Sequence, residues 1–137
     1  MTIPPLVNGI LPPGPYAATL SEVRMAFDQP GSNTRPALDK ALEHAAALIW
    51  SLDTGTILYV NGSYVTSKLN PLDVDVAMRS DVWDDSRFAA AFSAAYPGEE
   101  ALFDFCFNLR QSAQQMEDHF RAIQESNAKE GIIRLIP

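Results

Sequence analysis

Hydrophobic residues recur at helical spacing in the first part of the chain. A capping-box pattern over 19–22 opens a short predicted helix, which Pro30 and Gly31 end. A longer helix is predicted over 35–52, with Pro36 suited to its first turn. The apolar stripe of this longer helix consists of Leu38, Leu42, Ala45, Ala46 and Ile49.

Shorter apolar segments farther along predict β-strands. The β-branched and aromatic run 57–60 predicts a buried strand, and 73–78 predicts a second one. Phenylalanines at every other position predict a third strand over 101–109, because side chains alternate between the faces of a strand. The apolar run 132–136 predicts a last, short strand.

The sequence predicts two further helices in the second half of the chain. Acidic and serine residues over 84–86 can cap a helix whose aromatic positions recur at helical spacing. Another helix is predicted over 112–125. The elements together predict an α/β (α+β) fold, a mixed β-sheet of about four strands flanked by helices. We expect one domain over 1–137, in which prolines make 1–17 an extended N-terminal arm.

Charge and cysteine content narrow the class of protein. Seventeen acidic and ten basic side chains give a formal net charge of -7, so general charge is not expected to hold the chain on nucleic acid. A single cysteine, Cys106, excludes an internal disulfide. Residues 1–11 lack a signal-peptide pattern and the longest apolar run, 45–50, is too short to span a bilayer. We therefore expect a cytoplasmic protein that does not enter the membrane.

The candidate chemistry is concentrated between residues 59 and 78. Gly62 after a buried strand allows a sharp turn and close approach of a ligand, and Ser63 adds a hydroxyl and an amide that can contact phosphate oxygens. Asp73 and Asp75 are two apart in the predicted second strand, so both side chains leave the same face. Two such carboxylates repel each other unless a cation lies between them, and oxygen ligands suit Mg²⁺ or Mn²⁺.

Asp104 is the one charged residue among apolar neighbours in the predicted third strand. Burying a carboxylate there is costly unless it is compensated, and a shared metal would compensate it. If the third strand lies beside the second, Asp104 completes a three-carboxylate site. The structural alternative for Asp104 is a salt bridge to Arg110 or Arg121, and for Asp73 and Asp75 it is a solvated strand end.

A Gly-Ser pair, nine residues and Asp-x-Asp form a pattern that resembles the nucleotidyltransferase superfamily, which includes DNA polymerase β. More narrowly, the whole chain resembles a small prokaryotic and phage family of unknown function in that superfamily. The segments that carry this resemblance are Leu11–Gly14, Gly62–Lys68, Pro71–Asp75 and Lys129–Leu135.

The superfamily resemblance implies a role for each candidate residue. Gly62 and Ser63 would hold the β- and γ-phosphates of a nucleotide. Asp73 and Asp75 would hold divalent metals, and Asp104 would hold the catalytic metal and help to deprotonate the acceptor hydroxyl.

Two positions depart from the superfamily pattern. Asn61 precedes the Gly-Ser pair, where superfamily members usually have an apolar residue. An arginine often follows the pair in the superfamily, whereas here the nearest cation is Lys68, which becomes the candidate to balance the charge of a triphosphate. An exposed loop position without a ligand is the alternative for Lys68.

The implied reaction moves a nucleoside monophosphate from an NTP, such as ATP, to a hydroxyl on RNA, protein or a small molecule, with Mg²⁺ or Mn²⁺. A toxin–antitoxin or phage-defence role would fit a stand-alone transferase of this size. The alternative is a catalytically weak nucleotide-binding, antitoxin or inhibitor protein that acts through a protein partner. Surface or capping roles are expected for His44 and His119, and a packing role for Cys106.

Overall fold

The computed structural model of the chain describes residues 3–80, 82, 85–107 and 131–137, with the backbone alone at 85 and 104–107. Its helices are α1 (Leu20–Ala26), α2 (Arg35–Leu52) and α3 (Asp85–Ala95), with 3-10 turns η1 (Ser63–Val65) and η2 (Glu99–Leu102). Its strands are β1 (Pro15–Ala18), β2 (Ile57–Asn61), β3 (Val74–Arg79), β4 (Phe103–Phe107) and β5 (Ile132–Leu135). The predicted helix over 112–125 lies outside the described residues.

The strands form one mixed sheet in the order β1-β5-β2-β3-β4. β2 runs antiparallel to both β3 and β5, whereas β1 pairs with β5 and β4 pairs with β3 in parallel. The predicted α/β class with a mixed sheet is confirmed, but the sheet has a fifth strand. This strand, β1, lies in the segment predicted as an extended arm. Pro15 is tolerated because it is the first residue of an edge strand.

The described helices begin where the sequence predicts, but α1 ends at Ala26, with Phe27 as its C-cap, before the predicted stop at Pro30 and Gly31. α1 begins at the predicted capping box: the Glu22 amide donates to the Thr19 hydroxyl (3.2 Å), and the Thr19 amide donates to the Glu22 carboxylate (3.0 Å). α2 has the predicted bounds and buries its whole predicted stripe. α3 buries Phe92, which meets Phe103 of β4 edge to face with ring centroids 5.6 Å apart. Within the described ranges, no helix is long and apolar enough to cross a membrane.

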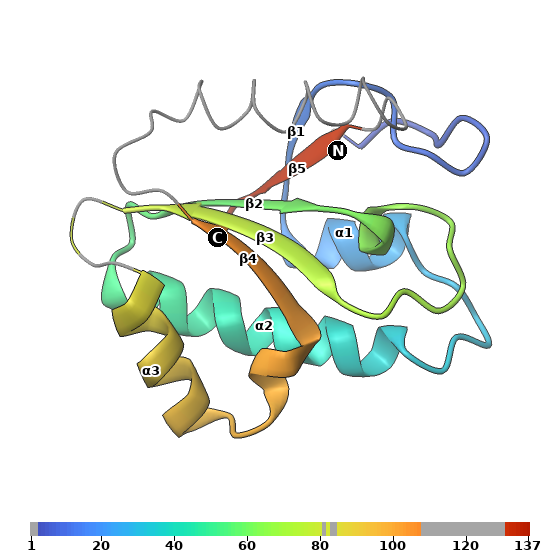
Figure 1. The fold of residues 1–137 in the computed structure, drawn as a ribbon. Helices are drawn as coiled ribbons and strands as arrows, with labels where there is room; N and C mark the ends of the chain where they lie inside the picture. The colour runs from blue at the N-terminus through green and yellow to red at the C-terminus, as the bar shows by residue number, and fades with distance from the viewer. Residues whose placement is uncertain (1–2, 81, 83–84, 108–130) are drawn as a thin grey trace.

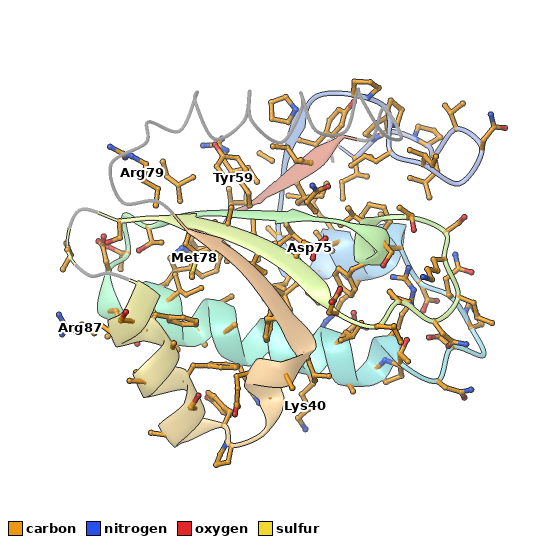
Figure 2. The ribbon with its side chains drawn as sticks, viewed as in Figure 1. Lys40, Tyr59, Asp75, Met78, Arg79 and Arg87 are labelled. Atoms are coloured by element: carbon orange, nitrogen blue, oxygen red, sulfur yellow. The ribbon has the colours of Figure 1, made fainter. Side chains whose placement is uncertain are left out.

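Helices α1, α2 and α3 lie on one face of the sheet (Figure 1). On that face the sheet contributes Leu58, Val60, Val74, Val76 and Met78 to the main core. Figure 2 shows Met78 directed toward the helices and Tyr59 directed away from them. Tyr59, Ala77 and Ile132 form a second buried cluster on the opposite face. Since side chains alternate along a strand, Asp75 of β3 belongs to the face opposite the helices.

The N-terminal segment packs against the end of the chain. The Gly131 amide donates to the Leu11 carbonyl (2.7 Å), and the Ile132 amide donates to the Gly14 carbonyl (2.9 Å). A Cβ at Gly131 would lie 2.2 Å from the Pro12 carbonyl oxygen, so only glycine lets the two segments approach this closely. Parts of the two terminal segments that carry the narrower resemblance therefore meet beside β1 and β5.

Candidate functional site

The site is built around the turn between β2 and η1. Gly62 precedes η1 with φ +79° and ψ -165°, a backbone conformation that favours glycine. A Cβ at Gly62 would lie 2.1 Å from Oδ2 and 2.8 Å from Cγ of Asp75. The sequence predicted that a ligand approaches Gly62 closely, but the space where a Cβ would lie is filled by the Asp75 carboxylate of the chain itself.

Asn61, Asp75 and Asp104 lie at paired positions on three adjacent strands of the sheet. Asp75 pairs with Asn61 of β2 on one side and with Asp104 of β4 on the other. The predicted third strand does lie beside the second, as the three-carboxylate hypothesis required, although it is shorter than predicted because residues 101 and 102 belong to η2. The side chain of Asp104, and with it any salt bridge to Arg110 or Arg121, lies outside the described part of the chain.

Asp73 lies one residue before the sheet. β3 begins at Val74, so the predicted strand start at Asp73 is one residue too early. Val74 and Val76 are buried in the core, whereas Asp73 and Asp75 are both partly exposed. The two carboxylates therefore keep the predicted alternation with the buried valines. Asp73 has no partner in the ladder between β2 and β3.

Ser63 and Lys68 lie at the two ends of the segment that follows Gly62. Ser63 is the first residue of η1 and is partly exposed, and its carbonyl accepts a hydrogen bond from the Thr66 hydroxyl (2.6 Å). The Lys68 side chain is exposed, and its amide donates to the Thr66 hydroxyl (3.2 Å).

Arg35, which the sequence did not single out, fixes this segment from the start of α2. Its guanidinium donates to the carbonyls of Tyr64 (2.8 Å), Thr66 (2.8 Å) and Lys68 (2.8 Å). Arg35 is 4% exposed, and burial lowers the pKa of its guanidinium. It remains charged because an arginine pKa lies far above neutrality. No sequence signal marks this role, since the acceptors are backbone carbonyls about thirty positions away.

Tyr64 and Asn70 tie the same loop to the helices. The Tyr64 hydroxyl donates to the Asp39 carboxylate, and burial together with this bond raises the Tyr64 pKa. The Asn70 side-chain oxygen accepts from the Asn33 amide (2.8 Å) and the Ser32 hydroxyl (3.2 Å). The loop between η1 and β3 is thus anchored to the α1–α2 connection and the first turns of α2.

His44 belongs to a different part of the molecule. Its Nδ1 lies 2.8 Å from the Glu99 carboxylate, and its ring stacks on Tyr96 with centroids 4.1 Å apart. This partly buried contact joins α2 to the turn after α3, a structural role that differs from the surface or capping role expected for His44. His119 and the side chain of Cys106 lie outside the described residues.

Comparisons with known proteins place the chain in a family whose function is not known. Residues 4–136, nearly the full length, match a family described as "Family of unknown function (DUF6932)". No curated protein and no solved structure matches the chain. The geometry of the residues is therefore what bears on function.

Proposed function

The chain belongs to the DUF6932 family of unknown function, and from the geometry of its site we propose that it is a metal-dependent nucleotidyltransferase. The observation that carries the proposal is the contact of the Gly62 backbone with the Asp75 carboxylate. This contact joins the segment that would bind phosphates to the segment that would bind metal.

The donor atoms at the site suit a hard divalent cation. Asp73 and Asp75 offer carboxylate oxygens and are partly exposed, and Asp104 is the register partner of Asp75. These three residues would hold Mg²⁺ or Mn²⁺, which when bound would stabilise negative charge on the reacting phosphate oxygens. The described side chains, which do not include that of Asp104, contain no group of three acidic, histidine or cysteine residues suited to a metal. The proposal therefore depends on the Asp104 carboxylate as the third ligand.

The proposed reaction is an in-line displacement at the α-phosphorus of an NTP such as ATP. The acceptor hydroxyl oxygen forms a bond to the α-phosphorus, the bond from that phosphorus to the bridging oxygen breaks, and pyrophosphate leaves. Asp104 takes up the hydroxyl proton. The Gly62 backbone and the Ser63 hydroxyl bind the β- and γ-phosphates, and the exposed ammonium of Lys68 balances their charge.

The acceptor is proposed to be a hydroxyl on RNA, protein or a small molecule. A net charge of -7 gives the whole chain no general attraction for RNA, so an RNA acceptor would be held by local contacts. We place the protein in the cytoplasm, where NTPs and Mg²⁺ are available. A role in a toxin–antitoxin or phage-defence system, with a protein partner, is compatible with a transferase of this size.

The transferase proposal is tested by following the α-phosphate. The purified protein is incubated with cell extract, Mg²⁺ or Mn²⁺, and each of the four NTPs labelled at the α-phosphorus. Relative to extract alone, we expect the added protein to increase α-label on RNA, protein or a small molecule, and to give no increase with NTP labelled at the γ-phosphorus. Asp75→Asn should lower the transfer about a hundredfold or more. Asp28→Asn, which removes an exposed carboxylate between α1 and α2, should leave it unchanged.

Two outcomes would contradict the transferase. Transfer of the γ-label alone would indicate a different phosphoryl chemistry. NTP binding without any transfer would favour the nucleotide-binding protein that acts through a partner.

A further inference from the structure

The guanidinium of Arg35 uses nearly all its hydrogen-bond donors within the protein. Nη1 donates to the Tyr64 carbonyl, Nη2 to the Thr66 and Lys68 carbonyls, and Nε also to the Lys68 carbonyl at 3.1 Å. A guanidinium has five N–H groups in a fixed planar fork, so a buried arginine with these contacts has little left to offer a ligand. Arg35 therefore acts on the backbone of the loop rather than on a substrate.

Tyr64, the residue after Ser63, is held at three points. Arg35 binds its carbonyl and lies over its ring, with the guanidinium carbon 5.5 Å from the ring centroid. Asp39, one turn farther along α2, accepts a hydrogen bond from the Tyr64 hydroxyl. Because Tyr64 is buried and fixed at its backbone, its ring face and its hydroxyl, the neighbouring Ser63 has little freedom to move.

The other end of the segment is held in the same way. Arg35 makes two contacts to the carbonyl of Lys68, so one rigid fork joins the residue after Ser63 to Lys68 itself. On the other side of the loop, the Ser67 amide donates to the Gly9 carbonyl (2.9 Å). The two residues proposed to contact phosphate, Ser63 and Lys68, thus lie at the ends of a segment that Arg35 contacts at three of its carbonyls.

We infer that Arg35 is a positioning residue for the nucleotide site: by binding the carbonyls of Tyr64 and Lys68 it fixes the backbone that carries Ser63 and Lys68. This inference rests on the proposed function, because it assigns Arg35 to the same site. A lysine at position 35 would keep the positive charge, but its single ammonium could not reproduce a fork that binds three carbonyls. Arg35→Lys should therefore loosen the segment while it leaves the net charge unchanged.

The experiment compares Arg35→Lys with Ile49→Val, which loosens the packing of α2 in the buried core, away from the loop. Amide exchange reports on the segment through Val65 and Ser67, whose amides are hydrogen-bonded to the carbonyls of Gly62 and Gly9. Calorimetry at a temperature well below unfolding reports the dissociation constant for ATP with Mg²⁺. We expect Arg35→Lys to raise both the exchange rates and the dissociation constant about tenfold or more, as loss of a charge-assisted hydrogen bond would. Ile49→Val should change neither.

Any result other than these contradicts either the positioning role of Arg35 or the proposed function. Unchanged exchange at Val65 and Ser67, or faster exchange with unchanged ATP affinity, overturns the positioning role. If the wild-type protein binds no NTP, the proposed function fails, and the exchange data still show whether Arg35 fixes the segment. Should Arg35→Lys not fold, Tyr64→Phe removes the Asp39 anchor of the same residue, and the same two measurements apply.

Discussion

Gly62 combines a φ of +79° with a carboxylate oxygen 2.1 Å from where its Cβ would lie. Replacing Gly62 by a residue with a side chain would cost about 1–2 kcal/mol because of the positive φ alone. The added Cβ would also force the Asp75 carboxylate to move. The sequence could indicate a turn at Gly62, because a glycine follows a buried strand. It could not indicate that Asp75 fills the space, because that depends on the register between β2 and β3.

Gly62→Ala should lower the free energy of unfolding and weaken Mg²⁺-dependent nucleotide binding. Gly31→Ala is the matched control, because Gly31 has φ +92° but nothing within 4 Å of its Cβ position. The control should lose about 1–2 kcal/mol and keep its nucleotide affinity. Chemical denaturation and calorimetry measure the two effects. Equal losses in both variants would show that the Asp75 contact has no consequence.

Asp53 makes stability depend on pH at the turn after α2. The Gly55 amide (2.9 Å) and the Ser80 hydroxyl (2.8 Å) donate to its carboxylate and hold the Asp53 pKa below its ordinary value. A carboxyl with a lower pKa in the folded chain stabilises the fold above its unfolded pKa of about 3.9. That stabilisation is lost as the pH falls through the folded pKa.

We therefore expect wild type to be more stable than Asp53→Asn at neutral pH. The difference should shrink as the pH is lowered from about 5, because the asparagine does not titrate. Urea denaturation at a series of pH values measures it. A difference that stays constant with pH, or grows toward acid, would contradict the assignment.

At the scale of elements, the pattern of apolar residues was sufficient to predict those helices and strands whose own residues carry a capping or apolar-spacing signal. α1 follows from its capping box and α2 from a stripe that packs on the sheet, and β2 and β3 from short apolar runs. β1 could not be predicted in this way, because a strand of four residues beginning with Pro15 is defined by its pairing with β5. That pairing joins residues more than a hundred positions apart.

Gly131→Ala should separate the N-terminal segment from β5. The added methyl would lie 2.2 Å from the Pro12 carbonyl oxygen, and overpacking of this kind costs about 1–3 kcal/mol. Amide exchange at Ile132, which is bonded to the Gly14 carbonyl, should accelerate. Gly98→Ala is the control, because Gly98 has φ +88° and nothing within 4 Å of its Cβ position, and it should leave amide exchange at Ile132 unchanged. Unchanged exchange and stability in Gly131→Ala would show that the segment adjusts freely.

At the scale of the whole molecule, the antiparallel pairing of β2 with β3 brings together two motifs that are separated by nine residues in the sequence. Gly62, Ser63, Asp73 and Asp75 could be chosen from the sequence because their spacing matches a known pattern. Arg35 could not, because its role depends on how α2 packs beside the loop. The position of Asp104 beside Asp75 likewise required the register of β4.

The negative net charge of the chain means that a bound divalent cation would be needed for nucleotide binding. A chain of charge -7 repels a free triphosphate, and the proposed cluster of Asp73, Asp75 and Asp104 would repel it further. A divalent cation held by those carboxylates would reverse the sign of the local field. Nucleotide binding should therefore depend on the cation, and its dependence on Asp75 should be the same with every NTP that binds.

The most direct test is a calorimetric titration with each NTP in millimolar Mg²⁺, because it does not require the acceptor to be known. We predict that at least one NTP binds to wild type and to Asp28→Asn, and that binding is lost in Asp75→Asn and after chelation of the metal. Absence of binding by all four NTPs in wild type, or binding that persists in Asp75→Asn without metal, would contradict the proposed function.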